Sequence, residues 1–155
     1  MEIIQQIEHD FNQALKKKEE AEVSALRLIK SAIKNAEIAA RPEELDEEQA
    51  IKTLRALVKQ RQEAIELYQQ GNRQDLAEKE KQEIEIIKRY LPAELDESVV
   101  REIIKKAVAE VQPTSLKELG KVMGKVMPEI KGQMGGDKVS QLVKEELEKI
   151  LKTED

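Results

Sequence analysis

Cysteine is absent from the 155-residue sequence, and aromatic residues, proline and glycine are all scarce. Without cysteine the chain has no disulfide, no thiolate metal ligand and no thiol nucleophile. Aromatic residues make up only 2% of the sequence, so any core must be built from aliphatic side chains. Six Gly and four Pro are too few for the many turns of a strand-rich fold. These absences favour a helical protein.

Long apolar runs are also missing, and this absence bears on where the protein resides. No run approaches the roughly 18 residues that a membrane-spanning helix needs. The first residues, MEIIQQIEHDF, lack the basic start of a secretory signal and are too acidic for a typical transit peptide. We therefore expect a cytoplasmic protein with no membrane partner. The net charge of −5 argues against indiscriminate nucleic-acid binding but leaves room for a local basic surface.

Apolar residues recur at helical spacing along the chain, and no segment shows the alternation typical of a strand. Hydrophobic and charged residues, 39% and 38% of the sequence, suit a set of amphipathic helices. Pro and Gly divide the chain into about seven helical segments. The sequence therefore predicts an all-α fold, with an N-terminal bundle of about four helices over residues 1–91 and a small three-helix domain over residues 96–152.

Several helix boundaries can be predicted from capping residues. Asp46 with Gln49, and Ser115 with Glu118, match the capping-box pattern of a helix start. We expect Pro128 to end or kink the sixth helix. Further N-terminal caps are expected at Asn72, Asp96 and Asp137.

The residue types that carry catalysis are few or poorly placed. His9, the single histidine, has no second metal ligand at helical spacing. The serines lack both a G-x-S-x-G motif and a histidine base. Carboxylates alternate with Lys and Arg, and we interpret them as solvated helix faces. The segment GKVMGK at residues 120–125 lacks the spacing of a phosphate-binding loop. We predict no catalytic residue, no metal and no cofactor.

Residues 115–144 have the most unusual composition, with six Lys and three acidic residues. On a continuous helix Lys117, Lys121 and Lys125 fall within an arc of about 80°. Gly120 and Gly124 form a smooth strip beside them, and two glycines inside a helix cost about 2 kcal/mol relative to alanine. Either a neighbouring helix packs over this strip, which the geometry alone favours, or a nucleic-acid backbone approaches it and meets the lysines.

The loop KGQMGGD at residues 131–137 extends this candidate surface. Its glycines can present backbone N–H groups to an anion. The candidate RNA-binding residues are Lys117, Gly120, Lys121, Gly124, Lys125, Lys131, Gly132 and Lys138.

Residues 120–147, GKVMGKVMPEIKGQMGGDKVSQLVKEEL, resemble the C-terminal signature of the GatB/YqeY domain. The resemblance extends into the first half and covers nearly the whole chain. Its residues there are Leu26-Arg27, the stretch SAIKNAE at 31–37, Lys59-Gln60-Arg61, Arg73 and Tyr90-Leu91-Pro92.

The resemblance implies a free-standing YqeY-type protein, related to the tail of the GatB subunit of aspartyl/glutamyl-tRNA amidotransferase. It implies an all-α fold in two parts and a role like that of the tail, which helps to hold tRNA. Carbon–nitrogen ligase activity with glutamine as amido donor is also implied by the resemblance only. The chain lacks the catalytic part of that subunit.

Two functions of different classes stay open. The leading hypothesis is a non-catalytic module that binds tRNA or another RNA through the C-terminal domain. The alternative is a helical protein–protein adaptor that uses the long amphipathic helices of the first half. A contiguous positive surface around the sixth helix would favour RNA, and an exposed apolar patch would favour a protein partner. The oligomeric state is left open.

Overall fold

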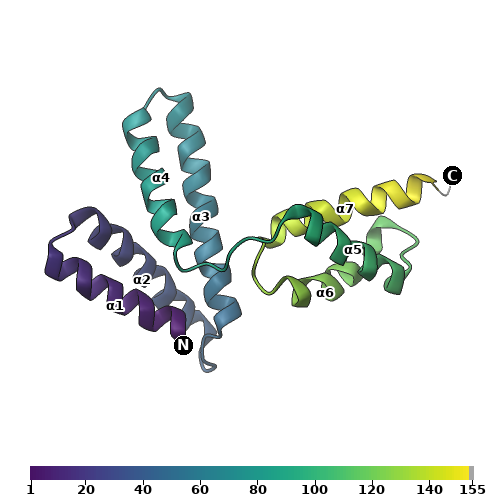
Figure 1. Cartoon of the computed structure of the whole chain (residues 1–155), viewed down its shortest axis with the longest axis horizontal. Helices are drawn as coiled ribbons and strands as arrows, with labels where there is room; N and C mark the ends of the chain where they lie inside the picture. Colours follow the sequence, from purple (N-terminus) through teal and green to yellow (C-terminus); the bar gives the residue numbers. More distant parts are fainter. Residues whose placement is uncertain (154–155) are drawn as a thin grey trace. The chain divides into compact units, whose positions relative to one another are not determined.

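The computed structural model describes residues 1–153, and all their regular secondary structure is helical. Seven α-helices and one short 3₁₀ helix follow one another, with no strand in this part of the chain (Figure 1). The predicted all-α fold is therefore confirmed. Contacts divide the chain into two compact units, Met1–Pro92 and Ala93–Asp155, and each unit has a hydrophobic core of its own.

The first unit consists of two helical hairpins. Helices α1 (Glu2–Lys17) and α2 (Glu20–Ala40) form one, and α3 (Glu47–Gln70) and α4 (Gln74–Lys88) form the other (Figure 1). Helix α2 contacts both α3 and α4 and so joins the hairpins.

The predicted capping box at the start of α3 is confirmed. The Asp46 carboxylate accepts a hydrogen bond from the Gln49 backbone N–H at 2.7 Å, and the Gln49 side chain accepts one from the Asp46 N–H at 3.0 Å. Two backbone donors that would otherwise lack a partner in the helix are thus satisfied.

The core of the first unit is aliphatic, with one buried aromatic side chain at its edge. Fully burying a Leu or Ile side chain contributes about 1.5–3 kcal/mol. Tyr90, which follows α4, is 7% exposed and donates a hydrogen bond to Asp10 Oδ2 at 2.6 Å. The adjacent Arg89 pairs with Glu22. These contacts hold the end of α4 against α1 and α2. The largest fully buried side chains of this core are Leu26, Ile29, Leu54 and Ile87.

The second unit contains three α-helices that contact one another in pairs around an aliphatic core. They are α5 (Glu97–Val111), α6 (Leu119–Ile130) and α7 (Gly136–Thr153), with the 3₁₀ helix η1 (Leu116–Glu118) immediately before α6. Apolar positions at helical spacing on each helix supply the core, as the periodicity predicted. Its fully buried members are Val100, Ile104, Val122, Val126, Ile130, Val139, Val143 and Leu147.

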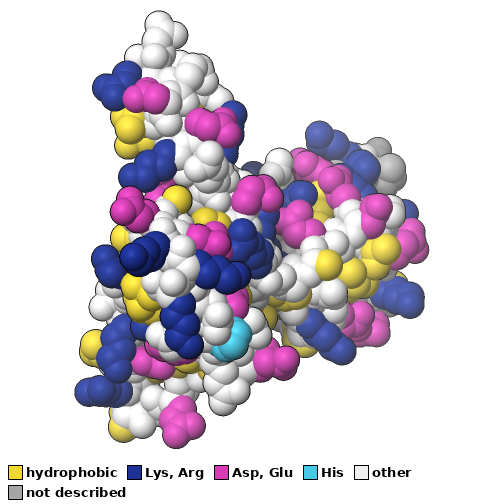
Figure 2. All heavy atoms as spheres, turned by 60° about the vertical axis from the view of Figure 1, so that its left-hand side comes forward, with side chains coloured by type: hydrophobic (Ala, Val, Ile, Leu, Met, Phe, Trp, Pro, Cys, Tyr) yellow, Lys and Arg dark blue, Asp and Glu magenta, His cyan; other side chains and the backbone are white. Residues whose placement is uncertain are grey.

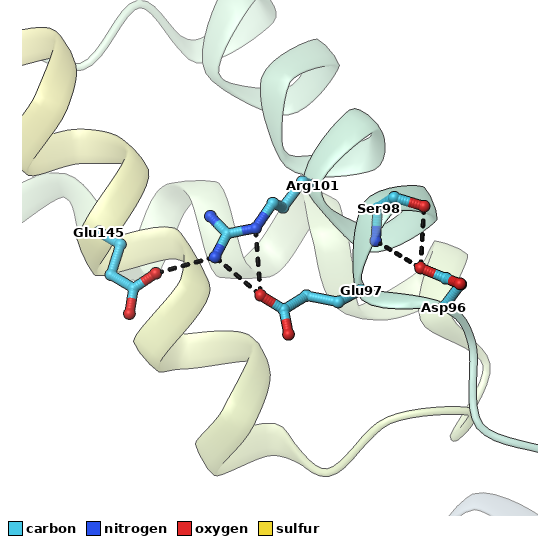
Figure 3. Close-up of polar contacts among 5 residues, drawn as sticks. All are labelled: Asp96, Glu97, Ser98, Arg101 and Glu145. Carbon is cyan, nitrogen blue, oxygen red and sulfur yellow. Dashed lines mark hydrogen bonds and ion pairs between the residues drawn. The ribbon is translucent and has the colours of Figure 1, made fainter.

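Polar contacts fix the start of α5 and its position beside α7 (Figure 3). Asp96 caps α5 as predicted, because its Oδ1 accepts from the backbone N–H and the hydroxyl of Ser98 at 2.9 and 2.8 Å. These hydrogen bonds, the one from the backbone first, hold the pKa of Asp96 below its usual range. Arg101 on α5 donates to Glu97 at 2.8 Å and to Glu145 on α7 at 3.0 Å.

Three predicted helix boundaries are wrong. Helix α6 runs through Pro128 to Ile130, so Pro128 does not end it, because the fully buried Ile130 side chain holds the last turn in the core. A kink at Pro128, the other predicted effect, stays a prediction. Asn72 has a φ of 55°, and the capping position of α4 falls to the following residue. Helix α7 begins at Gly136, so Asp137 lies inside its first turn.

Candidate nucleic-acid interface

The segment before α6 differs from the predicted continuous helix. Leu116–Glu118 form a 3₁₀ turn, and α6 begins only at Leu119. Ser115 makes no side-chain capping hydrogen bond. The Glu118 carboxylate accepts instead from the backbone N–H and the hydroxyl of Thr114, and the backbone hydrogen bond is the main reason that the pKa of Glu118 lies below its usual range. The predicted capping box at Ser115 is therefore wrong.

Lys117 consequently lies outside α6, so the continuous helix on which the arc of about 80° was calculated is not formed. A 3₁₀ turn has about three residues per turn, so the angular step before α6 differs from that of an α-helix. Lys121 and Lys125 stay one turn apart on α6, and all three lysine side chains are exposed.

Two of these lysines have carboxylate neighbours. Lys121 Nζ lies 3.4 Å from Glu118 Oε1, and Lys125 Nζ lies 3.3 Å from Glu110 Oε2 on α5. More than half of each lysine side chain is exposed, so water and salt screen both ion pairs. A phosphate group can therefore displace either carboxylate.

Gly120 and Gly124 face open space. A Cβ atom placed on either glycine would meet nothing within 4 Å in the described part of the chain, apart from the backbone of α6 itself. Within the second unit as described, up to residue 153, no helix packs over this strip, so the interpretation that the sequence geometry favoured is wrong. The physical reason is that α6 turns its other side to the core, where Val122 and Val126 are completely buried.

Lys131 and Gly132 belong to the connection between α6 and α7, whereas Lys138 lies in the first turn of α7. Lys131 follows α6 with a φ of 51°, and Gly132 continues with a φ of 74°, a region that favours glycine. The Met134 side chain is 2% exposed and anchors the middle of the connection in the core. Lys131, which follows α6, and Lys138, in the first turn of α7, are both exposed.

The structure brings four candidate residues, from Gly120 to Lys125, onto one exposed part of α6. Lys117 precedes the helix, and Lys131, Gly132 and Lys138 follow it. A helix of 12 residues is about 18 Å long. The eight candidates, four on α6 and four in the segments before and after it, are together called the α6 surface below.

A hollow between α1 and α2 is a second candidate site, which the sequence pattern did not reveal. It has a volume of about 440 Å³ and combines apolar residues of α1 with cations of α2. Figure 2 brings forward the side of the molecule that carries these helices, and Lys and Arg side chains gather there. Lys30 Nζ lies 4.2 Å from the centroid of the Phe11 ring. The only signal in the sequence is the spacing of Arg27, Ser31 and Lys34 on one helical face.

One carboxylate contradicts the interpretation of all acidic residues as solvated. Glu83 on α4 is 9% exposed and pairs with Arg61 on α3 at 3.0 Å. Glu80 lies 3.9 Å from the same guanidinium. The sequence could not reveal this pair, because its two members are 22 positions apart and meet only when α3 and α4 pack.

Side chains that could bind a metal ion are dispersed over residues 1–153. No three His, Cys, Asp or Glu side chains of this part come close enough to hold a metal ion. His9 is exposed on α1. What the structure offers is surfaces for binding, namely the α6 surface and the hollow between α1 and α2.

These features define an all-α protein of two helical units with an exposed row of lysines and glycines along one helix. A family model described as Yqey-like protein matches residues 4–147. The chain belongs to this family, and the resemblance seen in the sequence is confirmed.

Curated relatives of this chain carry the name altered inheritance of mitochondria protein 41, mitochondrial. The protein of Lachancea thermotolerans is 36% identical over 91 residues, which are 59% of this chain and 49% of the relative. That of Vanderwaltozyma polyspora is 35% identical over 100 residues, covering 60% and 54%. That of Pyrenophora tritici-repentis is 27% identical over 135 residues, covering 84% and 72%. The chain spans about half the length of the first two relatives.

The names of these relatives correct the expectation of a cytoplasmic protein, because each relative is named as a mitochondrial protein. The expectation relied on the absence of long apolar runs and on the character of the first residues, MEIIQQIEHDF. Cellular addresses are read by receptors from dedicated segments, so the composition of a helical domain says little about its compartment. Within residues 1–153, no helix combines the length and the apolar character needed to cross a bilayer.

Proposed function

We propose that the second unit is a non-catalytic module that binds RNA, tRNA in particular, along the α6 surface. The observation that carries this proposal is the open space over Gly120 and Gly124. Glycine inside a helix costs about 1 kcal/mol relative to alanine, and no packing contact in the described structure requires glycine at these positions. Because neither glycine has a side chain, a nucleic-acid backbone can come close to the helix at both positions.

The charge of the same segment supports the proposal. The whole chain carries a net charge of −5, whereas residues 115–144 hold six Lys and three acidic residues. Lys117, Lys121 and Lys125 are exposed beside the glycines and can contact phosphates. Phosphate contacts position a nucleic acid without reading its sequence, which suits a module that holds RNA for another component.

The resemblance of residues 120–147 to the tail of the GatB subunit points in the same direction. That tail helps to hold tRNA while a separate part of the subunit performs the chemistry. Amide transfer is not part of our proposal, because no nucleophile with a neighbouring base was found in the sequence.

The first test is binding of tRNA across a series of salt concentrations. Each lysine that meets a phosphate contributes about one unit to the slope of log K against log salt. Replacing Lys117, Lys121 and Lys125 by Ala should flatten the slope by up to about three units. The matched control removes three exposed charges from the first unit, with Lys52→Ala, Lys81→Ala and Lys88→Ala. It should leave the slope nearly unchanged.

A second variant, Gly124→Leu, tests access without changing charge. Its side chain would project into the open space over α6, so tRNA binding should weaken by about tenfold or more while the melting temperature does not fall. Equal slopes for the two triple variants would contradict the proposal. Absence of tRNA binding by the unmutated protein at low salt would reject it and leave the adaptor hypothesis in its place.

A further inference from the structure

We propose that the hollow between α1 and α2 binds a nucleoside phosphate, either free or as an unpaired nucleotide of RNA. This inference goes beyond the proposed function, since it concerns the first unit and a different ligand contact. The hollow, of about 440 Å³, lies within the size range of small-molecule sites. Its lining has a cationic side on α2 and an apolar side on α1, and each side fits one part of a nucleotide.

The cationic side suits the phosphate. Arg27, Ser31 and Lys34 follow one another at intervals of four and three residues, so they share one face of α2 and line the hollow together. All three are exposed. A guanidinium, a hydroxyl and an ammonium group all donate hydrogen bonds, and phosphate oxygens accept them.

The carboxylates at the hollow leave one cation available. Lys30 pairs with Glu8 at 3.1 Å, and Lys34 pairs with Glu37 at 3.6 Å. Among residues 1–153 Arg27 has no carboxylate partner within ion-pair distance, and its guanidinium lies 6.0 Å from the Phe11 ring centroid. Arg27 is therefore the residue that we expect to make the strongest contact with a phosphate.

The apolar side suits the base. Phe11, the only phenylalanine of the chain, and Ile4 line the hollow and are both partly exposed. Stacking of a base on an aromatic ring contributes about 1–3 kcal/mol in single-stranded nucleic-acid sites. Lys30 already lies 4.2 Å from the Phe11 ring centroid, which shows that a cation and the ring share this small space.

The test is a titration of the full ¹⁵N-labelled chain with AMP, followed through its backbone amide shifts. The amides of Phe11, Arg27, Ser31 and Lys34 should shift together with one dissociation constant. Adenosine and inorganic phosphate should each bind about tenfold more weakly or worse, since each offers half of the contacts. No shift of these amides at millimolar AMP would overturn the proposal.

Matched variants separate a built site from general charge attraction. Arg27→Gln should raise the dissociation constant for AMP by about tenfold. Lys81→Gln, which also removes one positive charge, at an exposed side chain of α4, should not change it. Phe11→Leu should weaken AMP but not inorganic phosphate. The proposal would be overturned if Arg27→Gln and Lys81→Gln changed the dissociation constant for AMP equally. It would also be overturned if the Phe11→Leu variant bound AMP as tightly as the unmutated protein.

Hexa-adenylate distinguishes the source of the nucleotide. Tighter binding than AMP at the same residues identifies an RNA nucleotide, and binding no tighter than that of AMP identifies a free nucleotide.

The outcome of the AMP titration is separable from that of the tRNA-binding experiment. Loss of tRNA binding at the α6 surface would leave the AMP shifts of α1 and α2 in place, and absence of AMP shifts would leave the salt slope for tRNA in place.

Discussion

Arg61 and Glu83 are charged residues in a largely buried place, with both side chains 11% exposed. Arg61 Nε donates to Glu83 Oε2 at 3.0 Å, and its Nη1 donates to the Leu57 carbonyl oxygen at 3.4 Å. Removing charges from water costs several kcal/mol per ion unless each has a partner. Each member of this pair therefore offsets the cost of burying the charge of the other between α3 and α4.

Replacing Glu83 alone should be strongly destabilising. Glu83→Gln leaves the Arg61 charge with Glu80 at 3.9 Å as its remaining acidic neighbour, so we expect a loss of about 3 kcal/mol in the free energy of unfolding. The double variant Arg61→Met with Glu83→Met should be close to neutral, because no charge is left buried. Urea unfolding of the two variants measures both values. A double variant as unstable as the single one would contradict this account.

Tyr90 makes the free energy of unfolding depend on pH in the alkaline range. Burial first, and then the hydrogen bond to Asp10, raise the pKa of Tyr90 far above its usual value of about 10. The folded state favours the neutral phenol, so this contribution is fully present below pH of about 10 and is lost as the pH rises further. Tyr90→Phe should cost about 1–2 kcal/mol at pH 7 and should lose less stability than the unmutated protein between pH of about 10 and 12. Urea unfolding across this range is the measurement, and parallel losses in both proteins would argue against it.

At the scale of secondary structure, α6 carries two glycines, Gly120 and Gly124, that face solvent. Its buried stripe of Val122, Val126 and Ile130 is sufficient to dock it on α5 and α7. The exposed part is therefore free of packing constraints. If RNA binds here as we propose, helix stability and binding are in opposition, because a residue that favours the helix more than glycine would place a side chain in the open strip.

Alanine at Gly124 should stabilise the protein. The added Cβ meets open space, so the gain in helix propensity of up to about 1 kcal/mol is not offset by a clash. Gly132→Ala is the matched control and should be destabilising, because Gly132 has a φ of 74°. Thermal melts of both variants give the comparison. A lower melting temperature for Gly124→Ala would show that the strip has a packing role.

At the scale of the whole molecule, the two units have separate hydrophobic cores. The core of the first is built from α1 to α4 and Tyr90, and that of the second from α5, α6 and α7 with Met134. Each unit thus buries its own apolar stripes, and the stability of one core does not require side chains from the other.

Leu147→Ala should destabilise the second unit alone. Leu147 is completely buried, so the substitution removes apolar contacts and leaves a cavity that costs about 2–5 kcal/mol. Hydrogen exchange should accelerate in α5, α6 and α7 while the amides of α2 and α3 keep their protection. Leu116→Ala, at a side chain that is 44% exposed, is the control and should have little effect. An equal loss of protection in α2 and α3 would contradict the separation of the two cores.

The all-α class, the apolar stripes of the helices and the caps at Asp46 and Asp96 follow from the sequence alone. They depend on residues only two to four positions apart. The sequence also carried the family, through motifs spread along the chain. Which groups from different helices come into contact depends on how the helices pack on one another. Glu83 is buried because α3 packs on α4, and Tyr90 reaches Asp10 across 80 positions. The open strip over Gly120 and Gly124 is decided in the same way, since helical spacing places the glycines on a face but cannot say whether another helix covers that face.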